Sequence, residues 1–214
     1  MNSNWNLPEP LSEETLADMG ENLIAEIRSA FAGVSIKGGI TLTEAYAIDN
    51  YEDAATRSRA RAQDTYTDWT KIDVCRLDPG QSALSFIDPI GFRFHLPAYM
   101  CRIIKQQTTH QLSGFLDLER LLPTFQIAND YGKRMTAEFD QAQFAACARF
   151  LIYVAEEQFT RESEYCEDTE RLAKDMYDYQ SPLRIMRVAW WQYLSEKERL
   201  ALLIRWPVLQ EDPY

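Results

Sequence analysis

The chain has 214 residues, of which 46% are hydrophobic and 26% charged, and its formal net charge is −11 at pH 7. This composition is that of a soluble globular protein, and the length of the chain allows a sizeable core. The negative charge argues against nucleic acid as a partner, because phosphates attract Lys and Arg. The same charge suits either plain solubility, which is the simpler interpretation, or electrostatic steering of a cationic partner.

Cysteine spacing and hydropathy argue against several further classes. The four cysteines lie far apart without a C-x-x-C pair, which argues against a zinc ribbon, a redox motif or a disulfide framework; they are Cys75, Cys101, Cys147 and Cys166. No run approaches 18 uninterrupted apolar residues, and residues 1–10 lack the pattern of a signal peptide. We therefore expect a cytoplasmic protein without a membrane-spanning segment.

The first third of the chain predicts helices joined by short connectors. Residues 1–11 are expected to form a flexible arm, after which Ser12 caps a helix that ends near Gly33. Residues 37–42 contain two glycines and predict a short strand or an extended connector. Asn50 is expected to cap the next helix, as the first residue of a capping-box pattern.

Residues 83–100 combine aromatic residues, two prolines and a histidine between two polar regions. Asp88 is a good helix cap, and Pro89 follows at the first helical position, where its missing N–H is not needed. Pro97 disfavours helical dihedrals at Leu96. The pattern therefore predicts a helix of about two turns, a break near Leu96, and a second helix from Pro97 onward.

The last third of the chain predicts four amphipathic helices. Asp140 is expected to cap the first, residues 156–178 form an acidic one, and Ser181 opens the third ahead of a proline. Ser195 begins a capping box for the last helix, whose inward-facing residues are expected to be Leu200, Leu203 and Ile204. Overall we expect a mainly α, single compact multi-helix domain with about seven to nine helices and at most a short strand pair.

The expected organisation is a flexible arm over residues 1–11, a helical core over residues 12–158, and an acidic helical extension over residues 159–214 packed on that core.

The central segment resembles a bacterial family catalogued only as a domain of unknown function, whose members share a pattern like ALSFL-P-(A/G)FRFYLPAYM. The matching residues are Ala83-Leu84-Ser85-Phe86, Asp88-Pro89, Gly91-Phe92-Arg93-Phe94 and Leu96-Pro97-Ala98-Tyr99-Met100. The resemblance covers about residues 20–158. It implies no established activity, although small bacterial families of this kind are often encoded among interbacterial toxin and immunity genes.

An enzyme would find its best candidate residues in the same segment, as Asp88, Arg93 and His95. Asp88 and His95 are seven residues apart, so on one helix they lie about 10 Å apart along the axis, too far for the carboxylate to orient the imidazole. A packed histidine is the simpler interpretation. The sequence contains no metal or cofactor motif, and the adjacent Glu156 and Glu157 are expected to be solvated rather than catalytic.

A binding role is the primary hypothesis. Acidic residues of the extension lie near two tryptophans, and the expected contact residues for a partner are Glu164, Glu167, Asp168, Asp175, Trp190 and Trp191. Aromatic side chains surrounded by carboxylates suit an Arg- and Lys-rich protein, most concretely a basic toxin domain that this chain neutralises as an immunity or inhibitor protein. Three alternatives remain open: an ordinary solvated face with buried aromatics, an enzyme around His95, and a structural homo-oligomer.

Overall fold

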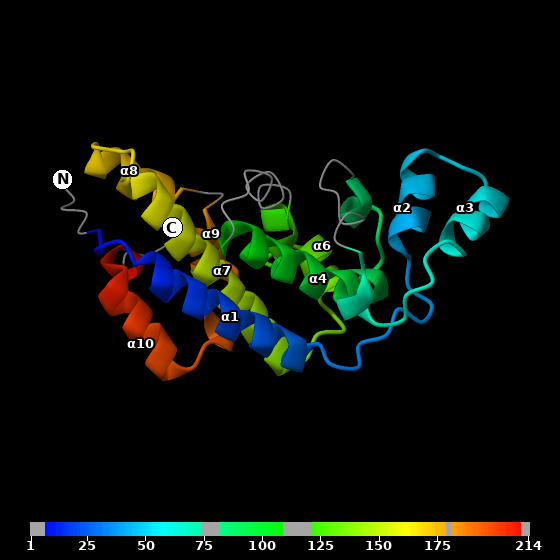
Figure 1. The fold of residues 1–214 in the computed structure, drawn as a ribbon, viewed down its shortest axis with the longest axis horizontal. Coiled ribbons are helices and arrows are strands. Elements are labelled where there is room, and N and C mark those ends of the chain that lie inside the picture. The colour runs from blue at the N-terminus through cyan, green and yellow to red at the C-terminus, as the bar shows by residue number, and fades with distance from the viewer. Residues whose placement is uncertain (1–6, 74–81, 109–120, 179–180, 211–214) are drawn as a thin grey trace. The chain divides into compact units, whose positions relative to one another are not determined.

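The computed structural model describes residues 7–73, 82–108, 121–178 and 181–210, and these residues form helices, turns and connectors (Figure 1). Nine α-helices and several short 3₁₀ or π segments lie within the described ranges, and those ranges contain no strand. The prediction of a mainly α fold with seven to nine helices is therefore confirmed. The expected strand or extended connector at residues 37–42 is a connector with turns.

The chain divides into two compact units. The terminal unit consists of Met1–Glu26 and Gln141–Tyr214, and the middle unit consists of Ile27–Asp140. The helices of the terminal unit are α1 (Glu13–Ala30, whose final turn belongs to the middle unit), α7 (Gln141–Ser163), α8 (Thr169–Met176), α9 (Pro182–Ile185), η5 (Met186–Trp190), η6 (Trp191–Tyr193), α10 (Glu196–Arg205) and η7 (Pro207–Gln210). The helices of the middle unit are α2 (Leu42–Asp49), α3 (Ala54–Arg61), η1 (Trp69–Lys71), η3 (Ser82–Ser85), α4 (Pro89–Thr108), η4 (Leu122–Phe125) and α6 (Asp130–Met135). The expected boundaries after residues 11 and 158 stay a prediction.

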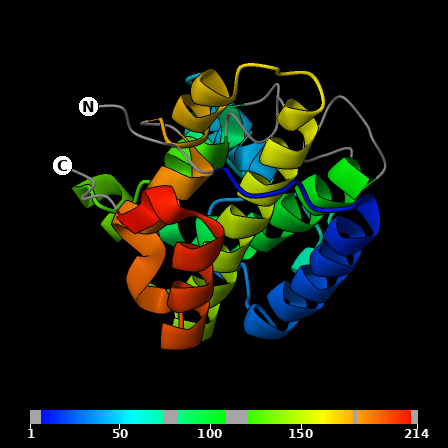
Figure 2. The same ribbon diagram turned by 90° about the vertical axis from the view of Figure 1, so that its left-hand side faces the viewer.

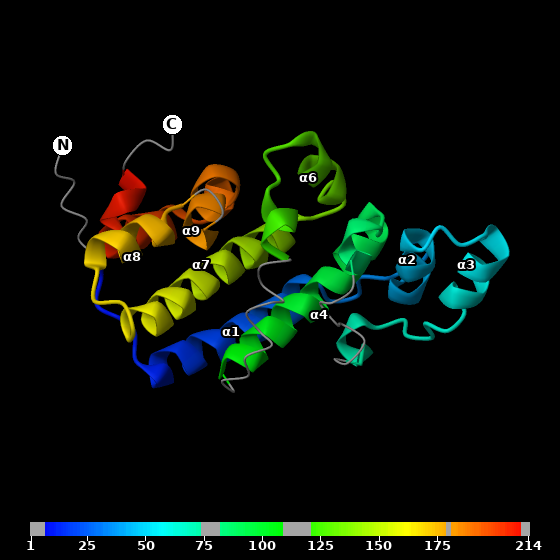
Figure 3. The ribbon, with the colours of Figure 1, turned by 90° about the horizontal axis from the view of Figure 1, so that it is seen from above.

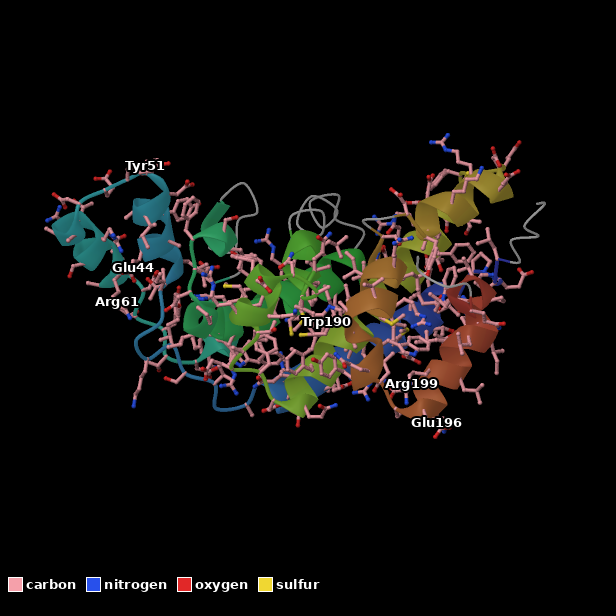
Figure 4. The ribbon with its side chains drawn as sticks, turned by 180° about the vertical axis from the view of Figure 1, so that it is seen from behind. Glu44, Tyr51, Arg61, Trp190, Glu196 and Arg199 are labelled. Atoms are coloured by element: carbon pink, nitrogen blue, oxygen red, sulfur yellow. The ribbon has the colours of Figure 1, made fainter. Side chains whose placement is uncertain are left out.

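Two short helices, α2 and α3, lie side by side in the middle unit (Figure 3). The prediction that Asn50 caps a helix was wrong, because a preceding helix, α2, ends there and Asn50 is its C-cap. Thr41 caps α2 by accepting a hydrogen bond from the backbone N–H of Glu44, and Asp53 caps α3 in the same way. An ion pair of 2.8 Å between Glu44 and Arg61 joins the two helices (Figure 4).

The central segment forms one continuous helix, α4, with Pro97 in its interior. The predicted break near Leu96 is therefore wrong. Proline removes one helical hydrogen bond and crowds the preceding turn, at a cost of about 3 kcal/mol. Every residue from Phe94 to Cys101 is buried. The packing of these side chains offsets the cost of the proline, which is why the helix continues where propensity alone predicts a break.

The start of α4 is held against the connector that precedes α2. Asp88 Oδ1 accepts hydrogen bonds from the backbone N–H groups of Gly91, at 2.8 Å, and Ile40, at 2.9 Å, so its expected role as a cap is confirmed. A Cβ atom at Gly91 would lie 2.3 Å from the carbonyl oxygen of Ile40. Glycine is therefore required there by the close approach of two backbone segments.

Helix α7 is the central element of the terminal unit. It contacts α8, α9, η5 and η6, and buried residues occupy every side of it from Ala146 to Phe159 apart from Arg149 and Gln158. Ser181 caps α9 as expected, and the helix then continues as a π segment and a 3₁₀ turn. These segments place Trp190 against Phe144 of α7, with ring centroids 5.8 Å apart.

Helix α10 presents apolar side chains to solvent. The capping box of Ser195 and Glu198 is confirmed, but the expected inward face is not: Leu200 is 59% exposed and Ile204 is 73% exposed. The buried positions are instead Leu202 and Trp206, one turn apart. Apolar residues occur on several sides of this helix, so periodicity alone does not identify the face that packs.

Candidate functional site

A groove of about 460 Å³ lies among α1, α7 and α10 of the terminal unit. In Figure 2, α1 and α10 lie on either side of α7. The lining residues are Met19, Asn22, Leu23 and Glu26 from α1, Arg149 and Ile152 from α7, and Glu198, Ala201, Leu202 and Arg205 from α10. They recur at intervals of three and four residues on α1 and α10, so each helix contributes one continuous face.

Arg149 links the two walls of this groove. Its guanidinium group forms ion pairs with Glu26 of α1 and with Glu198 of α10, the latter at 2.5 Å. Partial burial raises the pKa of Glu198, but hydrogen bonds from Arg149 and Ser195 outweigh this effect and lower the pKa to about 2. Glu198 therefore remains ionised at neutral pH and holds the start of α10 against α7 and α1.

A second charged cluster lies where α10 ends. Glu156 is only 4% exposed, and its carboxylate accepts two hydrogen bonds from Arg205, at 3.1 and 2.8 Å, and one from Trp206 Nε1, at 2.7 Å. Glu157 is also buried and pairs with Arg161. The expectation that both carboxylates are solvated was wrong, because buried residues occupy every side of this part of α7.

The four acidic residues predicted to bind a partner are all exposed. Glu164 and Glu167 lie in the turn between α7 and α8, Asp168 caps α8 through the backbone N–H of Arg171 at 3.0 Å, and Asp175 forms a 3.6 Å ion pair with Arg171. Helix α8 also carries an exposed Glu170–Lys174 pair. Much of the charge of α8 is therefore balanced within the helix itself.

The two tryptophans predicted for the same surface have different environments. Trp190, labelled in Figure 4, is 1% exposed. Its ring packs against those of Phe144 and Tyr193, so it belongs to the core and not to a contact surface. Trp191 is half-buried, with the guanidinium group of Arg187 4.7 Å from the centre of its ring. Of the expected pair, Trp191 alone has a solvent-accessible part.

The negative charge of the chain is concentrated in the terminal unit. That unit contains nine Lys and Arg residues against nineteen Asp and Glu residues, a net charge of −10, whereas the middle unit contains thirteen against fourteen, a net charge of −1. The first 26 residues hold six carboxylates and neither Lys nor Arg. On α1, Glu14, Asp18 and Glu21 are exposed along one side of the helix, which we call the α1 acidic stripe. Sequence reasoning missed this stripe, although counting charges over residues 1–26 identifies it.

The three candidate catalytic residues, in and just before α4, each make structural contacts. His95 is fully buried; its Nδ1 lies 2.7 Å from the carbonyl oxygen of Gly91, to which it donates, and its Nε2 lies 3.3 Å from the hydroxyl of Tyr66, from which it accepts. Burial lowers the pKa of His95 to about 4, so the ring is neutral at pH 7. Asp88 binds backbone N–H groups, and Arg93 lies 4.0 Å from Asp140. The structure therefore places the three side chains in separate structural interactions.

The described residues include no group of three or more His, Cys, Asp or Glu side chains arranged to hold a metal ion. Among the helices of the described ranges, none is both long and apolar enough to cross a membrane.

Comparison with known proteins identifies the family of the chain. A family model described as a family of unknown function, DUF6714, matches residues 19–179. The match begins in α1 and runs through α8, so it extends past residue 158 and includes the acidic segment. No curated protein and no solved structure matches the chain. Because the matched region covers most of its length, the chain belongs to the DUF6714 family.

Proposed function

We propose that this protein is a non-enzymatic, cytoplasmic binding protein of bacteria that neutralises a basic protein toxin as an immunity or inhibitor protein. The observation that carries the proposal is the location of the charge: the terminal unit has a net charge of −10, and the middle unit is nearly neutral. An acidic surface of this kind attracts a cationic protein, raises its association rate and disfavours acidic competitors.

Exposed carboxylates in two places contribute to the proposed surface. The turn before α8 supplies Glu164 and Glu167, which are exposed. The α1 acidic stripe adds Glu14, Asp18 and Glu21 on a helix whose only Lys or Arg is Arg28, near its end. Because α8 carries its own cations, we place the larger share of the steering field on α1 and on the turn before α8.

The two alternative functions receive less support. An enzyme around His95 would need an accessible imidazole, whereas this ring is buried with both nitrogens hydrogen-bonded. A homo-oligomer would draw support from exposed Leu200 and Ile204, but it would bring together two terminal units that each have a net charge of −10. Like charges across an interface oppose association.

The proposal is tested with the protein encoded by the gene next to this one. We expect that protein to be basic, to arrest growth when expressed alone, and to be neutralised by co-expression of this chain. We expect the dissociation constant to rise on the order of tenfold or more between low and high salt, because salt screens the attraction between solvent-exposed charges of the two proteins. A neighbouring protein that arrests growth equally with and without this chain, and does not bind it, contradicts the proposal.

Charge-reversal variants locate the surface. Glu164→Lys combined with Glu167→Lys changes two exposed carboxylates that take no part in a helix cap. The matched control is Glu52→Lys with Glu138→Lys, the same charge change at exposed positions of the middle unit. The first pair is expected to slow association at low salt and the second to leave it unchanged. Equal effects of the two pairs would show that only total charge matters.

A further inference from the structure

An exposed apolar residue of α10, Ile204, adjoins the rim of the groove. Ala201 lines the groove and is exposed, and Ile204 follows it by one turn of the helix. Leu200 lies one turn before Ile204, on a side of α10 that faces away from the groove-lining residues. A large apolar side chain that is 73% exposed beside an apolar groove marks an interaction surface more strongly than an isolated exposed residue does.

The groove has the dimensions and the lining of a site for side chains. Its volume of about 460 Å³ lies within the range of roughly 300–1,000 Å³ typical of binding pockets. Met19, Leu23, Ile152 and Leu202 supply apolar walls and floor. The charged groups at its edges are already paired, since Arg149 binds Glu26 and Glu198, and Arg205 binds Glu156. An entering apolar side chain therefore leaves these ion pairs in place.

Charge determines which occupant suits this surface. Asp18 of the α1 acidic stripe lies one turn before Asn22, which lines the groove, so its carboxylate borders the α1 wall on the solvent side. The unit around the groove has a net charge of −10. An anionic amphiphile would be repelled by this field, and the arginines that would bind its head group are already engaged. A second copy of the terminal unit would carry the same net negative charge.

We propose that the groove between α1 and α10 receives the apolar face of a basic amphipathic helix on the protein partner. This inference rests on the proposed function and specifies the recognition element of the partner. Side chains at i, i+3 or i+4, and i+7 of the incoming helix enter the groove and contact Ile204 at its rim, which is the usual pattern for a helix bound in an apolar groove. Lys and Arg on its flanks face the α1 acidic stripe.

The test uses the full chain and three fluorescent peptides of 18 residues, each designed as a helix. One has Leu at i, i+3, i+4 and i+7 positions and Lys elsewhere, the second replaces every Lys with Glu, and the third keeps Lys but replaces every Leu with Ala. Fluorescence anisotropy at low salt measures binding. The Leu/Lys peptide is expected to bind at least tenfold more tightly than either of the others, because both its apolar face and its charge are required.

Ala201→Phe fills the groove from an exposed position without changing charge, and it is expected to weaken binding of the Leu/Lys peptide at least tenfold. Ala142→Phe is the matched control, because Ala142 is exposed on α7 and does not line the groove. Circular dichroism confirms that both variants keep their helix content. A variant with Asp18→Asn and Glu21→Gln removes charge from the α1 acidic stripe and leaves the groove intact.

The outcomes separate this inference from the proposed function. If Ala201→Phe binds like the wild type while the charge variant binds more weakly, the groove is not the site and the electrostatic proposal stands. Equal binding of the Leu/Lys and Leu/Glu peptides overturns the assignment of a basic occupant. Failure of all three peptides to bind overturns the groove assignment, and the growth assay then decides the proposed function by itself.

Discussion

Replacing Glu156 with Gln tests how the last helix is attached to α7. The carboxylate is buried and accepts three hydrogen bonds, two from Arg205 and one from Trp206. Gln is nearly the same size but has one acceptor oxygen, and its amide NH₂ would face the Arg205 guanidinium, which can only donate. Glu156→Gln therefore loses the charge and at least one hydrogen bond without creating a cavity.

The expected loss of stability is about 2–3 kcal/mol. Removing one partner of a buried ion pair costs about 3–5 kcal/mol when the other charge stays buried. The Arg205 side chain is 26% exposed, so it can turn partly toward water and recover some of that energy. The Gln amide oxygen can still accept from the indole N–H of Trp206, so the loss comes from the Arg205 donor that faces the NH₂ group, and leaving a donor unsatisfied costs about 1–3 kcal/mol.

Urea denaturation followed by circular dichroism measures the free energy of unfolding. Asp175→Asn is the matched control, since it removes the same charge from an exposed ion pair on α8 and is expected to change stability by less than about 0.5 kcal/mol. A cycle with Arg205→Met isolates the coupling between Glu156 and Arg205. If Glu156→Gln unfolds at the same urea concentration as Asp175→Asn, the buried cluster does not stabilise α10 as described.

Three further predictions concern the middle unit and the thiols. The pKa of His95 is about 4 in the folded chain against 6.5 in the unfolded chain, so the unfolded state takes up a proton first as pH falls. The free energy of unfolding is therefore expected to fall by on the order of 3 kcal/mol as pH drops from about 6.5 to 4. His95→Gln is expected to flatten this part of a stability–pH curve, and an unchanged slope would contradict the assignment. Gly91→Ala places a methyl group 2.3 Å from the Ile40 carbonyl oxygen and is expected to cost about 1–3 kcal/mol in thermal or urea unfolding, whereas a neutral effect would mean that the backbone contact is not maintained. Burial raises the pKa of the Cys101 and Cys147 thiols, so both are expected to react slowly with a thiol reagent in the folded chain. In a Cys75→Ser variant, only the half-buried Cys166 is expected to react quickly before denaturant is added. Rapid reaction of a second thiol would refute the burial of Cys101 and Cys147.

Local signals in the sequence were sufficient for four of the helix caps, although they assigned the cap of α3 to Asn50 instead of Asp53. Ser12, Asp88, Ser181 and Ser195 each cap the helix that the pattern predicted, because a cap depends on a side chain and backbone groups only two or three residues away. The helical class follows from the same local patterns combined with apolar periodicity.

Features that depend on distant residues could not be read from the sequence. Pro97 predicts a break by its local geometry, but the burial of the run around it keeps α4 continuous. Glu156 looked solvated because its partners, Arg205 and Trp206, are about fifty positions away. The apolar residues of α10 suggested several possible faces, and only the packing of Leu202 and Trp206 decides among them.

The candidate site was predicted in part. The acidic character was evident, and the four expected carboxylates are exposed, but Trp190 is a core residue. The groove depends on the meeting of α1 with α10, which are separated by most of the chain, so no window of sequence predicts it. The α1 acidic stripe was accessible to a simple count of charges over residues 1–26.

Site-specific photo-crosslinking tests most directly whether the groove of the terminal unit captures a basic helix. A photoreactive phenylalanine analogue is introduced in the full chain at Ile204, beside the groove, and separately at Tyr51, which is 95% exposed in the middle unit (Figure 4). Each protein is irradiated with the product of the adjacent gene, and the crosslinked peptide is identified by mass spectrometry. We predict crosslinking from position 204 to a Lys- and Arg-rich amphipathic helix, and little from position 51. Crosslinking from position 51 alone, or from position 204 to an acidic or non-helical segment, would contradict the account.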